Sequence, residues 1–373
     1  MVLLKDLYLY RNLLSMKSRL LIVILLLLAS CKLSHNPEAL KIRGFVDTVG
    51  FAHLDWQMDS IAARIGRSNA DTFGSHCQNG NPLRLAISPH DDYTYAGPLY
   101  FSLLKDVHAH TLILFGVAHK ARALGIEGKM VFGSFKKWKE PYGEVVVSAM
   151  QDNILKSLDT SFYLISDNLQ RVEHSLEALI PFLQHFNPGL EIIPILVPAM
   201  PFEKMQQAAT ALASAINTEA DKGNLNWGKD FAFVISTDAV HYGDEDWGGK
   251  NYAPFGADTL GYWLAVDHEK EIMRNCFSGE LTPDKAREFF EYTVDPKDYR
   301  EYKWTWCGRY AVPFGMLTAW NLAGLQHTTL RGSIYGYATS IDHPHLPVSD
   351  LHMGITAPAK LRHWVGYGAA GYR

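Results

Sequence analysis

The stretch Thr111–His119, which reads TLILFGVAH, decides the fold of this chain. It begins with a run that is apolar on both faces, which suits a central strand of a sheet covered on both sides. Runs of the same kind occur at Leu85–Ile87, Ile192–Val197 and Phe231–Ile235. Together the runs predict a buried central sheet. His119, at the end of the quoted stretch, is a polar residue just beyond one of its strands.

Helical patterns alternate with these runs. The first three are Pro98–Val107, preceded by Gly97, then Leu176–Phe186 and Glu203–Ala220. Later come the helical patterns Tyr262–Cys276 and Ala311–Gln326 and two late strands, Tyr335–Thr339 and Gly366–Tyr372. The alternation predicts an α/β fold, with a central mostly parallel or mixed sheet flanked by helices and ligands beyond the carboxyl ends of the strands. Because no linker interrupts residues 43–373, we expect a single domain there.

The first thirty residues have the pattern of a targeting segment. A basic stretch precedes an unbroken apolar run from Leu20 to Ala29, which is too short to span a bilayer as a helix. The run ends in Leu28-Ala29-Ser30-Cys31, which resembles a bacterial lipobox. We expect a lipoprotein signal peptide over residues 1–30, a lipid on Cys31, a tether over residues 31–42, and export to the bacterial cell envelope. An ordinary secretory signal or an uncleaved anchor is the alternative.

Composition limits the partners of the chain. Its hydrophobic content of 47% over 373 residues allows a large core, and its formal net charge of -4 is mild. No run of Lys and Arg is long enough to track a phosphate backbone, which argues against nucleic acid. We expect a small-molecule substrate or ligand, or a protein partner, with membrane contact through the lipid anchor only. A Cys77–Cys276 disulfide would leave Cys307 free, but the connectivity stays open.

Polar clusters follow three of the predicted strands, and each cluster contains a histidine. His90 follows the first run, His119 the second and His241 the fourth. Neutral imidazole is a good ligand for iron, copper or zinc, and a pKa near 6.5 also suits general acid–base chemistry. One such histidine among 16 would more often lie on the surface or be satisfied structurally. Three at equivalent places in the fold favour a functional site.

The stretch Glu173-His174-Ser175-Leu176-Glu177 opens the predicted helix Leu176–Phe186. Ser175 and Glu177 fit helix capping, because a hydroxyl accepts from first-turn amides and a carboxylate favours the positive end of the helix dipole. Glu173 and His174 fit capping less well. They are candidates for a second layer around a metal, bonded to a ligand imidazole and fixing its tautomer.

Cys307 lies in Trp304-Thr305-Trp306-Cys307-Gly308-Arg309, just before the predicted helix Ala311–Gln326. The thiolate of a cysteine near a helix start is favoured by the dipole and by a nearby arginine. Cys307 is therefore a candidate metal ligand or reactive thiol. The alternative is a buried, inert cysteine.

Five motifs follow one another along the chain: Pro89-His90-Asp91-Asp92-Tyr93-Thr94-Tyr95-Ala96-Gly97, Gly116-Val117-Ala118-His119, Glu173-His174-Ser175-Leu176-Glu177, Ser236-Thr237-Asp238-Ala239-Val240-His241-Tyr242-Gly243 and Cys307-Gly308-Arg309. In this order they resemble the Memo family, whose bacterial and archaeal members are called AmmeMemoRadiSam system protein B. The resemblance covers most of residues 43–373, and its weakest part is Arg43–Ile65.

The resemblance implies a fold similar to that of class III extradiol dioxygenases, which hold non-haem iron and cleave catechol rings. It also implies that His90, His119 and Cys307 are the metal-ligand positions. His241 and Asp238 would line the same pocket, with His241 at the place of an acid–base histidine and Asp238 orienting it. The implied cofactor is Fe(II) or Cu, with Zn as a further option, and the implied activity is redox chemistry on an unknown small substrate.

The chain departs from the family pattern after His90, where Asp91-Asp92 replace the usual Ala-Gly. The two carboxylates either favour a harder cation such as Fe(II) or Mn(II), or are solvated rim residues, which is the simpler interpretation. A lipobox is not the family's usual start, so we do not expect the radical-SAM partner that the family name implies.

Two other functions compete with a metal-dependent redox enzyme. The first is a lipid-anchored module that holds a ligand without turnover, in the same pocket or against an aromatic rim of Tyr93, Tyr95, Trp138 and Trp247. The second is a zinc-dependent hydrolase with Glu173 as its water-activating carboxylate. It ranks last, because the chain offers a cysteine in place of a third histidine or carboxylate ligand.

Overall fold

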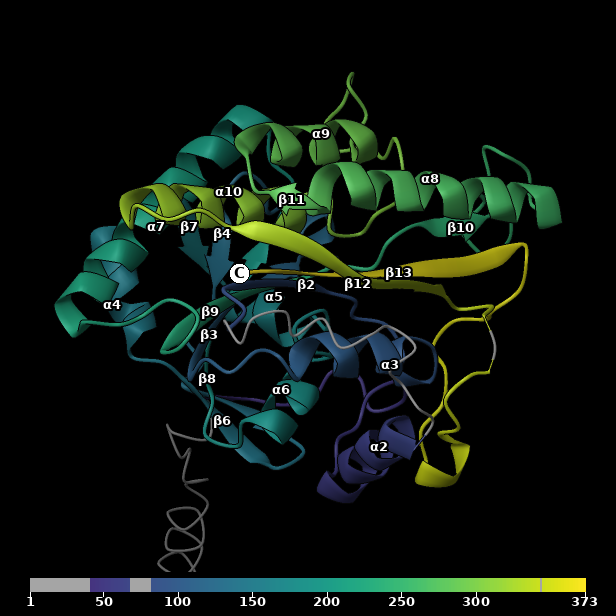
Figure 1. Cartoon of the computed structure of the whole chain (residues 1–373), viewed down its shortest axis with the longest axis horizontal. Coiled ribbons are helices and arrows are strands. Elements are labelled where there is room, and N and C mark those ends of the chain that lie inside the picture. The colour runs from purple at the N-terminus through teal and green to yellow at the C-terminus, as the bar shows by residue number, and fades with distance from the viewer. Residues whose placement is uncertain (1–40, 68–81, 343) are drawn as a thin grey trace, which may run out of the picture. The chain divides into compact units, whose positions relative to one another are not determined.

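The computed structural model describes residues 41–67, 82–342 and 344–373, and its contacts divide the chain into a unit that ends at Ile42 and a unit from Arg43 to Arg373. The second unit has the predicted α/β architecture, a large mixed sheet flanked by helices, which is consistent with a Memo and dioxygenase-like fold (Figure 1). The predicted signal peptide, with Cys31, lies outside the described residues. So does Cys77, the partner of Cys276 in the possible disulfide.

Strands and helices alternate along the chain. The strands are β1 (Ile42–Arg43), β2 (Leu85–Ser88), β3 (Thr111–Val117), β4 (Met130–Phe132), β5 (Lys137–Glu140), β6 (Gly143–Val147), β7 (Tyr163–Ile165), β8 (Glu191–Val197), β9 (Phe231–Ser236), β10 (His241–Gly243), β11 (Gly279–Glu280), β12 (Arg331–Thr339) and β13 (His363–Tyr372). The α-helices are α2 (Asp55–Arg67), α3 (Tyr93–Leu104), α4 (Met150–Ser157), α5 (Asp167–Arg171), α6 (Ile180–Phe186), α7 (Phe202–Gly223), α8 (Thr259–Phe277), α9 (Pro283–Thr293) and α10 (Ala311–Leu325).

The parallel strands β8, β3, β9 and β2 form the centre of the sheet, and they contain the four apolar runs. Their register pairs Ser88 with Ser236 and Val117 with Val197. The sheet continues through β6 and β5 on one side and through the antiparallel strands β13, β12 and β11 on the other. Because β2, β3 and β9 end in register, the residues that follow them meet at one edge of the sheet.

Helices cover both faces of this sheet. In Figure 1, α7, α8, α9 and α10 lie above it, and α2, α3 and α6 lie below it. Successive residues of a strand point to opposite faces, so Ile113 and Phe115 belong to one hydrophobic core, and Leu112 and Leu114 to the other. The two cores explain why the central runs are apolar at every position.

Four helices begin at other residues than the sequence predicts, and α3 and α6 differ the most. Helix α3 begins at Tyr93, so Pro98 lies inside it. A proline there leaves the carbonyl of Thr94 without its helical partner, and this carbonyl accepts a hydrogen bond of 2.9 Å from the backbone N–H of Leu346. Helix α6 begins only at Ile180, because the residues before it form turns that carry site residues.

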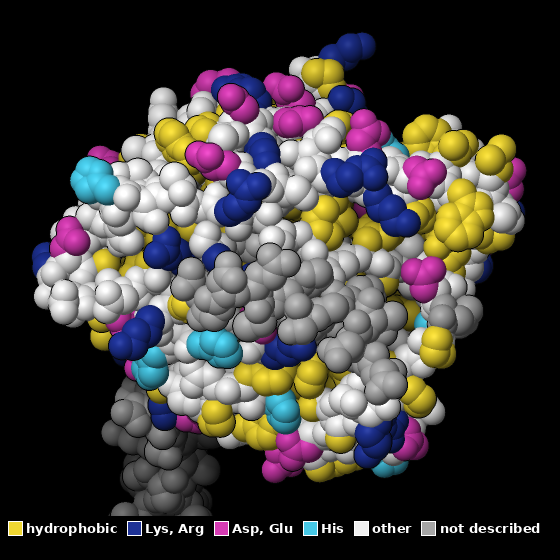
Figure 2. Space-filling view, viewed as in Figure 1, with side chains coloured by type: hydrophobic (Ala, Val, Ile, Leu, Met, Phe, Trp, Pro, Cys, Tyr) yellow, Lys and Arg dark blue, Asp and Glu magenta, His cyan; other side chains and the backbone are white. Residues whose placement is uncertain are grey.

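Basic and acidic side chains are interspersed on the face shown in Figure 2. Hydrophobic side chains gather at the upper right of that view, and α8 exposes Leu260, Trp263 and Leu264. Among the helices of the described residues, none combines the length and the apolar character that a membrane span requires.

Candidate metal centre

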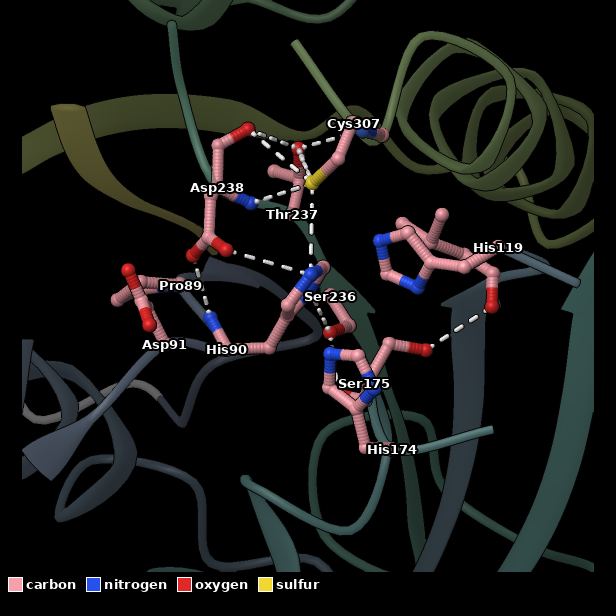
Figure 3. Close-up of polar contacts among 12 residues, drawn as sticks. Pro89, His90, Asp91, His119, His174, Ser175, Ser236, Thr237, Asp238 and Cys307 are labelled. Carbon is pink, nitrogen blue, oxygen red and sulfur yellow. Dashed lines mark hydrogen bonds and ion pairs between the residues drawn. The ribbon is translucent and has the colours of Figure 1, made fainter. Parts of the chain in front are cut away.

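The three predicted metal ligands meet at the carboxyl edge of the sheet. His90 lies two residues beyond β2, His119 lies two residues beyond β3, and Cys307 lies in the loop that leads to α10. One atom from each, an imidazole nitrogen or the thiol sulfur, lies within 4.8 Å of the other two. Figure 3 shows the three side chains converging. Their arrangement suits a single metal ion, and their role as ligands stays a prediction.

The hydrogen bonds of His90 leave one ring nitrogen directed at the thiol. Ser236 Oγ donates its single hydrogen to the carbonyl of Ser175 at 2.6 Å, so it must accept from His90 Nδ1 at 2.8 Å. The proton therefore lies on Nδ1, and Nε2 presents its lone pair 3.4 Å from Cys307 Sγ. Burial, and then the nearby His119, lower the pKa of His90 well below its ordinary value, so the ring is neutral.

Glu173 fixes the second imidazole in the same way. Its Oε1 lies 2.8 Å from Nδ1 of His119, and its Oε2 accepts from the backbone N of His119 at 2.7 Å. Burial opposes ionisation of this carboxyl, but the charge and hydrogen bond of His119 outweigh it and lower the pKa of Glu173 to about 2. An ionised carboxylate makes Nδ1 the donor and leaves Nε2 of His119 for a ligand. Glu173 thus makes the contact that we expected of it.

His174 packs on the candidate ligands and does not bond to them in the part of the chain that the structure describes. Its ring stacks on that of His119, with centroids 4.9 Å apart and planes at 7°, and it lies edge-on to His90 at 5.9 Å. Burial, and then His119, lower the pKa of His174 to about 4. His174 is therefore a neutral wall of the site.

His241 and Asp238 both lie in the site, but their hydrogen bonds differ from those that we expected. We expected Asp238 to orient His241. Instead, Asp238 Oδ1 accepts from the backbone N of His90 at 2.8 Å, and Oδ2 lies 3.3 Å from His90 Nε2. Nε2 of His241 is buried and has no hydrogen-bond partner among the described residues. Burial, and then His119, lower the pKa of His241 to about 3, which leaves a neutral imidazole next to the donors.

Cys307 lies in an environment that favours its thiol form. Burial, and then the carboxyl of Asp238, raise the pKa of Cys307 well above its ordinary value. The prediction of a thiolate favoured by the helix dipole and a nearby arginine is therefore wrong for the protein without a metal. The backbone N of Asp238 donates to Sγ at 3.0 Å. Gly308 permits this approach, since a Cβ there would lie 2.2 Å from Oγ1 of Thr237.

The two aspartates after His90 are not solvated rim residues. Asp91 Oδ2 accepts from the hydroxyl of Tyr367 at 2.6 Å. Asp92 is buried, and its oxygens accept from the backbone N and the hydroxyl of Thr356 at 2.6 and 3.0 Å. Both carboxyls therefore tie the start of α3 to C-terminal segments, and the rim interpretation is wrong.

Ser175 and Glu177 also have other roles than capping. Ser175 Oγ donates to the carbonyl of Val117 at the end of β3. Glu177 is buried and forms an ion pair of 2.7 Å with Arg43. Both residues precede the true start of α6, which explains why capping is wrong.

The expected aromatic rim is wrong for three of its four members. Tyr93, Tyr95 and Trp138 are buried in the core that contains α3 and α6. Trp247 stacks on His363 at 3.9 Å and lies 5.4 Å from His241, so it is the member of the set that reaches the site.

Comparison with known proteins places the chain in a family. A family model described as Memo-like protein matches residues 58–349. The chain belongs to the Memo family. Similar curated relatives are MEMO1 family proteins of Methanothermobacter thermautotrophicus, Metallosphaera sedula and Sulfolobus acidocaldarius, which are 28%, 27% and 30% identical over 169, 186 and 168 residues. These matches cover 44%, 49% and 44% of this chain and 56%, 61% and 55% of the relatives. The chain thus spans little more than half the length of the Memo relatives it matches.

Glu269 is a residue of this Memo-family site that we did not predict. From α8, its Oε1 accepts from the indole N–H groups of Trp304 and Trp306 at 2.5 and 2.6 Å, and its Oε2 accepts from the backbone N of Val240 at 3.0 Å. The carboxyl thereby joins the loop before Cys307 to the segment before β10. Its place on the apolar face of the predicted helix Tyr262–Cys276 was a signal for a buried role.

We expect Glu269→Ala to lower the free energy of unfolding by about 3 to 9 kcal/mol, because it leaves three buried N–H donors without an acceptor and each such donor costs roughly 1 to 3 kcal/mol. Burial raises the pKa of Glu269 to about 7 from an ordinary value near 4.5. A group with a raised folded-state pKa stabilises most below its unfolded pKa, so the loss should be larger at pH 5 than at pH 8. Urea denaturation of the unaltered protein and of Glu269→Ala at both pH values measures this loss of stability.

The matched control is Glu271→Ala on the same helix. The side chain of Glu271 is 53% exposed, so its loss should change stability by less than about 0.5 kcal/mol. Equal effects of the two substitutions would contradict the role given to Glu269.

A cavity of about 430 Å³ opens beside the candidate ligands of this Memo-family domain. Its walls include His119, Cys307, Arg309, Tyr302 and Tyr310. A space of this volume suits a small molecule, and its position would bring that molecule against the donor atoms.

Proposed function

We propose that this Memo-family chain is a metal-dependent redox protein in which His90, His119 and Cys307 bind Fe(II) or Cu and the neighbouring cavity holds a small substrate. The observation that carries the proposal is the direction of the free donor atoms. Both imidazoles bond through Nδ1 to oxygen atoms of the protein, which leaves Nε2 of each for a metal, and Nε2 of His90 lies 3.4 Å from the thiol sulfur. Metal-binding histidines generally have such a partner on the second nitrogen.

The donor set fits a first-row transition metal. Two imidazoles and one cysteine sulfur suit iron, copper or zinc, whereas Mg²⁺ and Ca²⁺ prefer oxygen. A buried imidazole nitrogen without a partner, Nε2 of His241, lies in the same cluster and offers a further donor or base. When bound, a redox-active metal would supply electron transfer to or from the substrate.

The protein's own residues would move the protons. His241 is neutral and can accept a proton at Nε2. Burial, and then Asp91, raise the pKa of Asp238 well above its ordinary value, so its carboxyl is protonated and can donate one. An acceptor and a donor therefore flank the sulfur of Cys307.

The zinc hydrolase is disfavoured by the hydrogen bonds of Glu173. A hydrolase needs a carboxylate free to activate a metal-bound water. Both oxygens of Glu173 instead accept from His119, and Oε1 also accepts from the backbone N of His174 and Ser175. The second candidate function, which the cavity supports, is a module that binds a ligand without turnover. Such a module should keep its ligand affinity after removal of all metal.

Anomalous diffraction at the iron, copper and zinc edges on one crystal tests the proposal. We expect one peak within bonding distance of His90 Nε2, His119 Nε2 and Cys307 Sγ, at the iron or the copper edge. A peak at the zinc edge alone would contradict the redox assignment. A peak away from the three side chains, or none after soaking with each metal, would contradict the site itself.

A further inference from the structure

Three arginines line the cavity beside the candidate metal centre, and they differ in how their charge is balanced. Arg122 pairs with Glu301 at 2.9 Å, and Arg300 pairs with Glu127 through Nε at 2.9 Å. Arg309 has no carboxylate partner within the residues that the structure describes. Two of the three charges are thus neutralised by the protein, and the third is not.

Arg309 is also the most buried of the three. The whole residue is 8% exposed, whereas the side chains of Arg122 and Arg300 are 73% and 42% exposed. Its Nη2 donates to the carbonyl of Arg300 at 2.8 Å, and its Nε is buried without a hydrogen-bond partner in the described part of the chain. A buried cation with no counter-charge is costly, and such a group is retained where a ligand supplies the charge.

Aromatic rings hold the guanidinium of Arg309 in place. Its Cζ lies 3.4 Å from the ring centroid of Tyr302 and 4.8 Å from that of Tyr310. The hydroxyl of Tyr310 in turn donates to the carbonyl of Tyr299, which fixes that ring. Cation–π contact orders the group without neutralising it, so the charge is preorganised at the cavity wall.

We infer that the substrate of this site is a small organic carboxylate whose anionic group binds Arg309 while the rest of the molecule extends through the cavity toward His119 and Cys307. One unbalanced positive charge matches one negative charge, and a planar guanidinium suits a planar carboxylate. This inference names the substrate class for the proposed redox function and rests on it for what happens after binding. The binding itself depends on Arg309 and the cavity.

Calorimetric titration of the full chain, as purified with its metal, tests the inference with benzoate and its neutral analogue benzamide. We expect benzoate to bind at least tenfold more tightly. In Arg309→Met, which keeps an unbranched apolar side chain against Tyr302, the preference should fall below threefold. Arg122→Met is the matched control and should keep the full preference, because that arginine is exposed and already paired.

Several results would overturn the inference: no benzoate binding, equal binding of benzoate and benzamide, a preference retained in Arg309→Met, or tighter binding of phenylphosphonate than of benzoate. If Arg309→Met does not fold, Arg309→Lys keeps the charge and should retain a weakened preference for benzoate. The comparison of benzoate with benzamide in the unaltered protein tests the inference without any variant.

Metal content measured on the same samples separates the carboxylate inference from the proposed redox function. Benzoate preference without metal counts against the redox function alone, and metal without benzoate preference counts against the carboxylate alone.

Discussion

Protein purified without a histidine tag should contain about one iron or copper per chain, and the double variant His90→Ala, His119→Ala should contain less than a tenth of that. The two substitutions remove both imidazoles of the proposed donor set and leave only Cys307 of it, so the variant should lose its metal to the buffer during purification even if His241 contributes a nitrogen. Metal analysis by mass spectrometry, normalised to protein concentration, gives the ratio directly.

The control for this experiment is His108→Ala, His110→Ala. Both residues are exposed and lie at the amino end of β3, at the opposite end of that strand from His119. This variant should retain the full metal content. Equal metal in the double variant His90→Ala, His119→Ala and in the unaltered protein would exclude the proposed site, whatever the metal is.

Metal affinity should rise roughly tenfold for each unit of pH between 6.5 and 8, because binding must displace the proton of Cys307. Burial raises the pKa of this thiol well above its ordinary value, so it is protonated throughout that range. His90 is already neutral there and adds no competing proton. Affinity is therefore lost as the pH falls and gained as it rises. Competition with a chelator of known affinity at each pH measures the slope.

Cys307→Ser should bind metal more weakly and with a flatter dependence on pH, since no thiol proton has to leave. Cys276→Ser, at a buried cysteine of α8, is the matched control and should retain the steep slope. A slope near zero in the unaltered protein would mean that the sulfur is not a ligand or that it is ionised before metal binds.

The main features of the fold and site can be predicted from sequence because they depend on local patterns. A strand buried on both faces is apolar at every position, and the polar residue after it has to lie at the edge of the sheet. This is why His90 and His119 are found beside each other. The place of Cys307 before a helix made it a candidate ligand, but only the family resemblance grouped it with the two histidines, since nothing in its neighbourhood places it against β9.

Other parts of the site depend on contacts between distant segments. Ser236 fixes the tautomer of His90, although it looks locally like an ordinary strand end. Helical periodicity indicates that Glu269 is buried, but it does not identify the two loops that Glu269 connects. Asp92 looks like an exposed residue, but its carboxyl lies against Thr356 and the loop of Gly50, which are distant along the chain. Such roles follow from packing between segments, which local periodicity does not encode.

The distance along the chain between His90 and Cys307 is 217 residues, although their side chains lie 3.4 Å apart. Pairing of the central strands and docking of α10 bring the two groups together, and those contacts must offset the entropy lost on closing so long a loop. A partly made or truncated chain would expose two histidines but not the complete donor set. Binding of a metal by all three side chains would therefore need both the N-terminal and the C-terminal parts of the domain.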